Sequence, residues 1–407
     1  MTNWQEVRLG DVCIQITDGT HNTVEDCESG DCYLLSCKNI KNGNIEIGKN
    51  ERKIDRHTLE KLRKRTKTAK GDVLLSSVGT IGETAVIKLE NPNYEFQRSV
   101  AIFKPNLNFI TSEFLYYSLN SRKDILQHSA EGAVQQCLFI TPLKDFPISI
   151  PPLDVQKKIA GVLGALDDKI ELNNRINNNL EQQAQALFKS WFVDFEPFGG
   201  KMPDDWKIGK LEDVVDVIMG QSPSGNSYNE KGRGCIFFQG RAEFGFRFPT
   251  IKLFTTEPRR MARQNDILMS VRAPVGDVNV AHEDCCIGRG LCAIRSKDNF
   301  QSFIFYTLWS VQNKLNIFNG EGTVFGSINK DSLNNLEIIV PNSNTIQKFE
   351  NLCSPMDNLI RKNYEENTRL SALRDTLLPK LMSGEIDVSN VDISALTSTD
   401  KSSFSED

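Results

Sequence analysis

The chain has 407 residues, of which 39% are hydrophobic and 25% are charged, and its formal net charge is −5. This length allows two or three domains with apolar cores, and the sequence contains no 18-residue apolar run that would indicate a membrane span. No basic and apolar signal region opens the chain, and its 10 cysteines lack a zinc-binding spacing. We therefore expect a cytoplasmic protein with reduced thiols and no metal site.

The chain repeats itself in order, which predicts two copies of one module. Trp4 to Val12 matches Trp206 to Val214, and in each copy a polar turn, a basic segment and a buried strand follow. A glycine turn, a second β-branched run, a helix, a loop and a strand ending at proline complete each copy. The matching segments, first copy before second, are 17–21 and 219–225, 49–70 and 241–263, 71–76 and 265–270, 80–82 and 274–276, 97–100 and 288–291, 112–126 and 300–315, 131–134 and 321–324, and 146–151 and 336–341.

Each copy ends in a long stretch with apolar residues at alternating spacings of four and three, which is typical of a coiled-coil helix. Two asparagines stand in the middle of both patterns. Because the pattern is symmetric about its centre, antiparallel pairing places Asn173 opposite Asn367 and Asn177 opposite Asn363. A parallel pairing would also place asparagine on asparagine, so the orientation rests on topology as well. Arg374 is a polar exception, and Pro355 and Pro379 predict a kink or interruption of the second helix, unless Pro355 stands in the first turn of the main helix. The positions are Ile159, Leu163, Leu166, Ile170, Asn173, Asn177, Leu180, Ala184, Leu187 and Trp191, and Phe349, Cys353, Met356, Ile360, Asn363, Asn367, Leu370, Arg374, Leu377 and Leu381.

These patterns predict an α+β protein in which two repeated α/β domains are separated by two long antiparallel helices that form a coiled-coil spacer. The expected parts are a first domain at 1–150, a central helix at 151–196, a second domain at 203–341, a C-terminal helix at 342–384 and a disordered acidic tail at 385–407. At the usual helical rise, a 33-residue helix is about 50 Å long, which equals about 15 base pairs of DNA.

Positive charge is concentrated at the same place in both copies, although the chain as a whole is acidic. Residues 49–70 hold ten Lys or Arg against three acids, and residues 241–263 hold six against two. A solvated helix face is the ordinary explanation of one such run, but recurrence at one structural position favours two equivalent contacts with nucleic acid.

Catalytic motifs are absent from the sequence. It has no glycine-rich phosphate loop of the Gly-x-x-x-x-Gly-Lys-Ser/Thr type, and its four histidines have no metal-ligand spacing. The segment from Asn91 to Tyr94 resembles the Asn-Pro-Pro-Tyr loop of amino-methyltransferases except at its third residue, and an ordinary turn explains it. We therefore predict a protein without catalytic activity of its own.

The helical regions resemble those of a known family. Phe146 to Ile159, Leu166 to Ile170 and Ala186 to Phe198 are similar to the first conserved region of the specificity (S) subunit of type I restriction–modification systems. Leu377 to Ile386 is similar to the close of its second conserved region. The segments from Trp4 to Val12 and from Trp206 to Val214 are similar to the beginnings of the family's two target-recognition domains, so the resemblance covers nearly the whole chain.

The resemblance implies a DNA-reading subunit of bacterial or archaeal cytoplasm, associated with the nucleoid. Two methyltransferase (M) subunits would dock on it and methylate one adenine per half-site with S-adenosylmethionine, flipping the base out of the duplex. Two restriction (R) subunits, which use ATP and Mg, would join where the system includes them. The double-stranded target would be bipartite with a gap set by the helices, and this chain would bind no cofactor itself.

Candidate DNA-contacting residues follow from side-chain chemistry. Arginine addresses guanine edges, and asparagine or glutamine addresses adenine. The expected base readers are Thr20, His21, Lys38, Asn39, Ser77, Arg98 and Gln135 in the first domain, and Gln221, Arg241, Arg272 and Arg289 in the second. The expected phosphate contacts, which position the protein without specifying sequence, are Lys61, Arg63, Lys64, Arg65, Arg259, Arg260 and Arg263.

Two other classes of function remain open at the level of sequence. A stand-alone methyltransferase or nuclease would transfer a methyl group or cut DNA without a partner. A coiled-coil scaffold would show no salt-dependent DNA binding, whereas phosphate contacts require a steep dependence on salt.

Overall fold

The computed structural model describes residues 4–131, 136–319 and 326–393. The chain forms two compact units. The first unit comprises Met1–Leu172 with Glu366–Asp407, and the second unit comprises Asn173–Glu365. Each unit contains a mixed helix and sheet module and one half of each of the two long helices.

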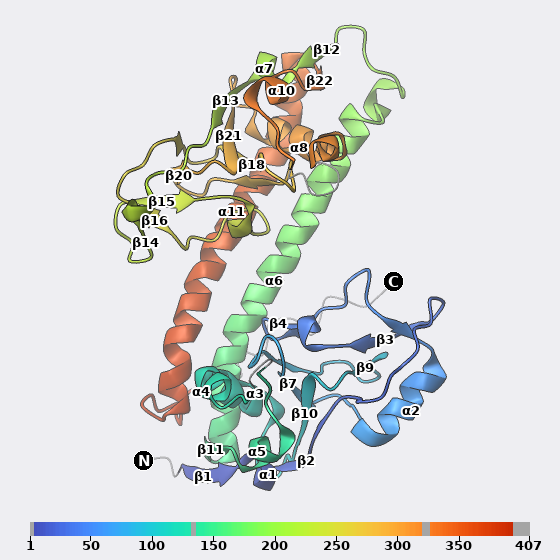
Figure 1. Cartoon of the computed structure of the whole chain (residues 1–407), viewed down its shortest axis with the longest axis vertical. Coiled ribbons are helices and arrows are strands. Elements are labelled where there is room, and N and C mark those ends of the chain that lie inside the picture. Colours follow the sequence, from blue (N-terminus) through green and yellow to red (C-terminus); the bar gives the residue numbers. More distant parts are fainter. Residues whose placement is uncertain (1–3, 132–135, 320–325, 394–407) are drawn as a thin grey trace. The chain divides into compact units, whose positions relative to one another are not determined.

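The first unit is built around a four-stranded antiparallel sheet in the order β2-β10-β7-β8 (Figure 1). A three-stranded sheet, β6-β3-β9, has a parallel pair between β3 and β9 and is covered by α2, whose Leu59 is fully buried against Cys32 and Leu34. Two short pairs, β1-β11 and β4-β5, complete it. The strands are β1 (Gln5–Arg8), β2 (Cys13–Asp18), β3 (Cys32–Leu35), β4 (Ile40–Lys41), β5 (Asn44–Ile45), β6 (Lys53–Ile54), β7 (Val73–Ser76), β8 (Thr84–Val86), β9 (Tyr94–Phe96), β10 (Val100–Pro105) and β11 (Pro147–Ile150), and the short helices are α1 (Leu9–Val12), α2 (Arg56–Thr66), α3 (Ser112–Ser121), α4 (Lys123–His128) and α5 (Ile140–Asp145).

The second unit repeats the four-stranded sheet and the terminal strand pair, and its second sheet is larger. Its four-stranded sheet has the order β13-β21-β18-β19, its second sheet has the order β14-β16-β15-β20-β17 with β15 and β20 parallel, and β12 pairs with β22. The predicted repeat of buried strands is therefore confirmed. The strands are β12 (Lys207–Lys210), β13 (Val215–Met219), β14 (Tyr228–Asn229), β15 (Cys235–Phe238), β16 (Phe254–Thr255), β17 (Met261–Ala262), β18 (Ile267–Ser270), β19 (Val278–Val280), β20 (Cys285–Ile287), β21 (Leu291–Ser296) and β22 (Glu337–Val340), and the short helices are α7 (Leu211–Val214), α8 (Gln301–Ser310), α9 (Gln312–Leu315) and α10 (Lys330–Asn334).

The two copies differ most in their basic segments. In the first unit the segment folds into β6 and the helix α2, whereas in the second it forms the short strands β16 and β17 within irregular chain. The predicted helices at 112–126 and 300–315 are each broken in two, at Arg122 and Val311. The repeat thus conserves the sheet that carries the loops and not the segment between its strands.

The two long helices are α6 (Leu153–Phe192) and α11 (Ser343–Met382), each of 40 residues. The predicted interruption of α11 is wrong, because the helix continues through Pro355 and Pro379. No helix in the described part of the chain combines the length and apolar character needed to cross a membrane.

Within the second unit, the halves of α6 and α11 pack against each other and run in opposite directions. Asn363 donates from Nδ2 to Oδ1 of Asn177 at 2.8 Å, as predicted, and both side chains are buried. Further along, Phe192 packs on Phe349 with ring centroids 5.1 Å apart. Residue numbers rise on one helix as they fall on the other, so this part of the pairing is antiparallel.

Within the first unit, the polar exception in the helical pattern has a partner. Arg374 donates to Oδ1 of Asp167 at 2.8 Å and to Asp375 at 2.9 Å, and Tyr117 donates to the other oxygen of Asp167 at 2.7 Å. Ile159, Leu163 and Leu381 are buried in the same apolar cluster. An ion pair therefore replaces an apolar layer at this point.

The prediction of a disordered tail from residue 385 is wrong for residues 385–393. Val388 is 3% exposed and belongs to the core of the first unit. The Lys158 ammonium donates to the carbonyl of Ser389, and Ile393 lies against Gly161. Apolar residues spaced through a Ser- and Asp-rich segment supply this packing. The rest of the predicted tail, 394–407, lies outside the described residues.

Candidate nucleic-acid interface

The same backbone hydrogen bonds fix one loop in both units, the loop that follows the first strand of the four-stranded sheet. The loop follows β2 in the first unit and β13 in the second. Its first two N–H groups donate to carbonyl groups at the two ends of a turn, which joins β9 to β10 in the first unit and β20 to β21 in the second. The equivalent bonds join Gly19 to Val100 (3.0 Å) and Gly220 to Leu291 (2.9 Å), and Thr20 to Phe96 (2.8 Å) and Gln221 to Ile287 (3.0 Å).

The loop and the turn touch so closely that only glycine fits at the first position. A Cβ atom on Gly19 would lie 2.1 Å from the carbonyl oxygen of Phe96, and one on Gly220 would lie 2.1 Å from that of Gly288. The missing side chain lets two backbone segments meet. Residues of the loop and of the turn therefore face the same space in both units.

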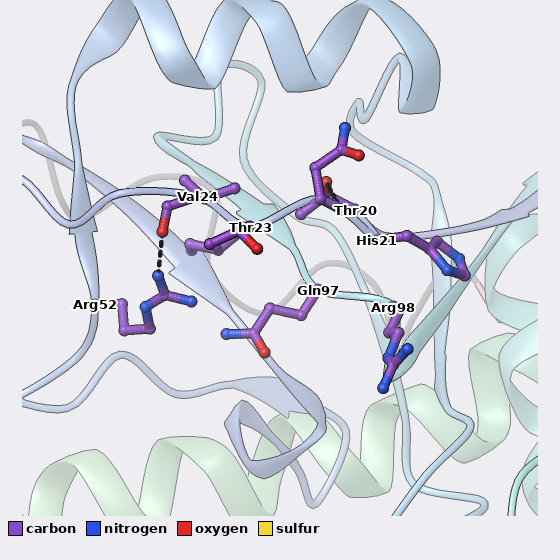
Figure 2. Close-up of a pocket in the computed structure, with 9 residues that line it drawn as sticks. Thr20, His21, Thr23, Val24, Arg52, Gln97 and Arg98 are labelled. Carbon is purple, nitrogen blue, oxygen red and sulfur yellow. Dashed lines mark hydrogen bonds between the residues drawn. The ribbon is translucent and has the colours of Figure 1, made fainter.

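In the first unit these segments line a hollow on the surface (Figure 2). Arg52 is held at its edge, because its guanidinium donates to the carbonyl of Val24 and to Asp26, both at 2.7 Å. Arg98 is exposed, and its guanidinium has no hydrogen bond or ion pair with the residues that the structure describes. The lining residues are Thr20, His21, Asn22, Thr23, Val24, Leu34, Arg52, Gln97 and Arg98.

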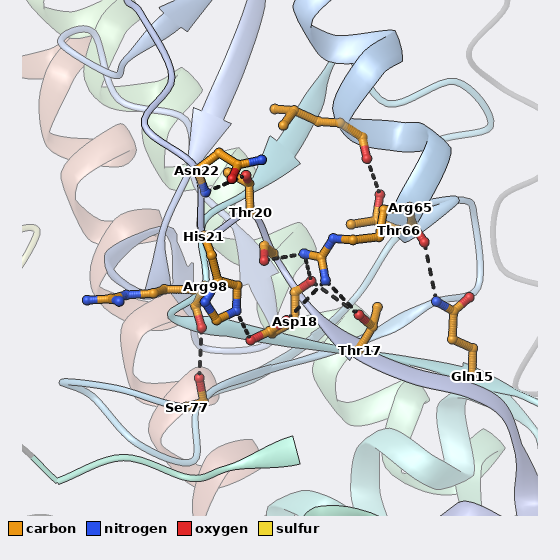
Figure 3. A network of polar contacts seen from close by, with 12 residues as sticks. Gln15, Thr17, Asp18, Thr20, His21, Asn22, Arg65, Thr66, Ser77 and Arg98 are labelled. Atoms are coloured by element: carbon orange, nitrogen blue, oxygen red, sulfur yellow. Dashed lines mark hydrogen bonds and ion pairs between the residues drawn. The ribbon is translucent and has the colours of Figure 1, made fainter. Parts of the chain in front are cut away.

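A polar network beside this hollow fixes the loop (Figure 3). Arg65 on α2 donates to the backbone carbonyls of Asp18 (2.6 Å) and Gly19 and to the Asp18 carboxylate (3.3 Å). The same carboxylate contacts Nε2 of His21 at 2.6 Å. Arg65 therefore ties α2 to the loop, and 49% of its side chain remains exposed to solvent.

The second unit has a hollow at the equivalent place. Its three arginines come from three segments, and only Arg241 has an acidic partner, Asp277, within the described residues. Arg272 and Arg289 are exposed, and neither guanidinium has a hydrogen bond or ion pair with the residues that the structure describes. Two exposed guanidinium groups without an acidic partner among the described residues suit an anionic backbone or the acceptor edge of guanine. The lining residues are Ser222, Gln239, Gly240, Arg241, Arg272, Ala273, Arg289 and Gly290.

A cluster of charged residues lies within the second unit around the buried Arg247, six residues after Arg241. Arg247 is 4% exposed, and it donates to the hydroxyl of Tyr306 (2.8 Å) and pairs with Asp357 (3.1 Å) and Glu181 (4.0 Å). Its guanidinium lies 3.9 Å from the ring centroid of Phe305. Burial opposes the charge of Arg247, but Asp357, Tyr306 and Glu181 outweigh it and raise the pKa of the guanidinium.

The structure brings together part of the predicted set. Thr20, His21 and Arg98 line the first hollow, and Arg241, Arg272 and Arg289 line the second. Gln221 is exposed on the loop beside the second hollow. The remaining exposed candidates lie outside both hollows: they are Lys38, which pairs with Glu51 at 3.1 Å, and Lys61, Lys64, Arg259, Arg260 and Arg263. Gln135 lies outside the described residues.

Burial contradicts two of the predicted base readers, and one predicted phosphate contact has a partner inside the protein. Asn39 is 2% exposed, and its amide both accepts from the N–H of Ser36 (2.9 Å) and donates to the carbonyl of Glu46 (2.8 Å), so it stabilises a turn. Ser77 is also 2% exposed. Arg63 has an internal partner, because its guanidinium neutralises the fully buried Glu95 at 3.0 Å; 27% of its side chain is exposed, and its phosphate contact stays a prediction.

Sequence reasoning missed several lining residues. Arg52 stood within the basic run but was not singled out, and Gln97 precedes a selected arginine in a segment that the repeat had already aligned. The basic run and the repeat could therefore have indicated Arg52 and Gln97 as lining residues. Asn22, Thr23 and Gln239 are ordinary loop residues, and no pattern in the sequence distinguishes them.

Two copies of one α+β module in a single chain, each with a basic hollow at the same point of the same framework, define a duplicated recognition protein. The chain belongs to the family described as the type I restriction modification DNA specificity domain, whose model matches residues 1–182 and 203–370.

Similar proteins carry the same description. The chain is 34% identical to the putative type I restriction enzyme MjaX specificity subunit of Methanocaldococcus jannaschii, over 78% of this chain and 79% of that protein. It is 25% identical to the type I restriction enzyme HindI specificity subunit of Haemophilus influenzae, over 95% and 100%. The crystal structure of the S subunit from a type I restriction–modification system of M. genitalium shares the fold, with a TM-score of 0.58 and 17% identity over 93% of this chain and 96% of that one.

Proposed function

We propose that this chain is the DNA sequence-specificity subunit of a type I restriction–modification complex and reads a bipartite, gapped target. The observation that carries the proposal is the duplication of the hollow: the same hydrogen-bonded framework presents a different set of polar and basic side chains in each unit. One framework with two linings suits the reading of two different half-sites.

In this proposal the first module, at 1–150, and the second, at 203–341, are target-recognition domains, and the two long helices form an antiparallel coiled-coil spacer. The Asn177–Asn363 hydrogen bond supports it, because a buried amide pair disfavours other alignments of the helices. Forty helical residues are about 60 Å long, so the helices are long enough to set the gap between half-sites.

We further propose that the chain is not itself an enzyme and acts in the cytoplasm on nucleoid DNA. Two methyltransferase subunits, which use S-adenosylmethionine, would dock on it and methylate adenine N6 in each half-site. Where the system includes restriction subunits, two of these would join and use ATP and Mg for cleavage. The family membership supports these partners, and their stoichiometry is part of the proposal.

The decisive experiment is a genome-wide map of N6-methyladenine in cells that carry this chain and its methyltransferase, compared with cells that lack only this chain. A gapped, asymmetric motif with one modified adenine per strand, lost on deletion, supports the proposal. An unchanged map in cells whose methyltransferase is active contradicts it.

Two further measurements separate the alternatives. Methyl transfer from labelled S-adenosylmethionine by the purified chain alone would indicate a stand-alone enzyme, and DNA affinity that does not fall with salt would indicate a scaffold. Insertion of one heptad into both long helices should lengthen the gap in the methylated motif without changing either half-site.

A further inference from the structure

We propose that Arg98 and Arg289 are equivalent anchors for the DNA backbone, whereas Arg272 reads a guanine in the half-site of the second unit alone. The inference rests on the proposed function and divides the two hollows into a shared part and a discriminating part. It also revises the expectation from sequence that Arg98 and Arg289 read bases.

Arg98 and Arg289 occupy the same position in the fold. Each is the second residue of a tight turn that leads into the central strand, and the turns are closed by N–H to carbonyl bonds from Val100 to Gln97 (3.1 Å) and from Leu291 to Gly288 (3.0 Å). The backbone N–H of each arginine is held by the neighbouring loop. Arg98 donates to the carbonyl of Thr20 at 3.0 Å, and Arg289 donates to the hydroxyl of Ser222 at 3.2 Å.

The repetition of this arginine is not explained by the fold. Arg63 shows what a structural arginine looks like in this chain, since its guanidinium makes three bonds to Glu95, Pro92 and Tyr94. The guanidinium groups of Arg98 and Arg289 are exposed and make no such bond to the described residues, as Figure 3 shows for Arg98. Both guanidinium groups are therefore accessible to a partner from outside the chain.

A residue shared by both units must contact what both half-sites share. The half-sites of an asymmetric target differ in bases, but both present phosphates at regular spacing. A guanidinium binds phosphate through two parallel N–H donors, and a rigidly held turn can aim it. The shared arginines therefore position each unit on the duplex without choosing its sequence.

Arg272 occupies a place where the two units differ. Its counterpart is Val78, because the neighbouring carbonyls of Ser77 and Val271 accept from Leu138 (2.9 Å) and Ile328 (3.0 Å) in the same way. Arg272 is exposed in the same hollow as Arg289, whereas valine offers no donor. A difference in lining is needed to read different sequences, and arginine pairs bidentately with O6 and N7 of guanine.

The test measures binding of the full chain, assembled with its methyltransferase subunits, to the target duplex and to duplexes with single base-pair changes at several salt concentrations. The variants are Arg98→Ala, Arg289→Ala and Arg272→Val, which installs the residue of the other unit. Arg369→Ala on α11 is the matched control, since Arg369 is exposed outside both hollows.

For Arg98→Ala and Arg289→Ala we expect target and non-target affinities to fall by the same factor and the slope of log affinity against log salt to decrease by about 1. Arg98→Lys should keep most of the affinity, because lysine also binds phosphate. For Arg272→Val we expect a loss of discrimination of roughly 5- to 150-fold at one base pair of one half-site, with the salt slope little changed. The control should match the unmodified protein.

The contrary results are distinct. Loss of discrimination at a single base pair in Arg98→Ala or Arg289→Ala, or unchanged affinity, would overturn the shared anchor. A uniform loss of affinity, or no change, in Arg272→Val would overturn its role as a base reader. If the unmodified complex itself showed no preference for any target, the proposed function would fail instead.

Discussion

Replacement of Arg247 by methionine should destabilise the second unit strongly. Methionine keeps much of the apolar packing against Phe305 but leaves the carboxylates of Asp357 and Glu181 without their cation. Removal of one partner from a buried ion pair costs about 3–5 kcal/mol. We expect a loss near the lower end, about 3 kcal/mol, because a quarter of the Asp357 side chain is exposed to water.

The loss should be visible in thermal unfolding followed by calorimetry on the full chain. For a unit of this size, 1 kcal/mol corresponds to about 2–4 °C, so Arg247→Met should lower the melting temperature of the second unit by about 6–12 °C. Adding Asp357→Asn to Arg247→Met should recover part of the loss, since the second change removes the orphaned charge.

Arg259→Met is the matched control, because Arg259 is exposed and its side chain has no hydrogen bond or ion pair within the described part of the chain. It should shift the melting temperature by less than about 2 °C. An Arg247→Met shift as small as that of the control would refute the reasoning. The ion cluster would then add no more stability than an exposed side chain does.

Three further outcomes follow from the structure. Asn177→Leu alone should lower the free energy of unfolding in chemical denaturation by about 1–3 kcal/mol, because Asn363 loses its buried partner. Adding Asn363→Leu should restore stability and admit other alignments of the helices, which spin-label distances would detect. A single alignment in the double variant would count against a role of the asparagine pair in fixing register. Burial raises the pKa of Glu181 above 4.5, so the folded state disfavours the charge of this carboxylate at neutral pH. Glu181→Gln should therefore raise the free energy of unfolding at pH 7, and this gain should vanish below pH 4.5. An equal gain at both pH values would argue against burial of the charge as the cause. Gly220→Ala should cost about 1–3 kcal/mol in thermal unfolding because its methyl group would meet a carbonyl oxygen at 2.1 Å; an unchanged melting temperature would show that the loop can move.

The fold could be predicted where the two copies of the sequence constrain each other. The strands β7 and β18, the turns before β10 and β21 and the Asn177–Asn363 pair all follow from segments that recur at matched positions. The predicted domain limits remain predictions, because the compact units divide inside the long helices.

The prediction was weakest for individual side chains, which were selected by residue type alone. Both Arg63 and Arg247 lie in basic runs, yet each neutralises an acid that is distant in sequence. The acid is the fully buried Glu95 in one case and the partly exposed Asp357 in the other. Spacing along the chain does not reveal such partners. The prediction that Asn39 reads a base was wrong for a similar reason. The residue type alone does not distinguish a buried asparagine that closes a turn from an exposed one that contacts adenine.

The second unit is one continuous stretch, Asn173–Glu365, whereas the first unit needs Glu366–Asp407 in addition to Met1–Leu172. During synthesis, the second unit can therefore complete its core while the first still lacks Leu381 and Val388. The half made first on the ribosome is finished last. A chain that ends near residue 375 and continues into a linker long enough to clear the ribosomal exit tunnel should carry a protease-resistant second unit and a first unit that is still cleavable.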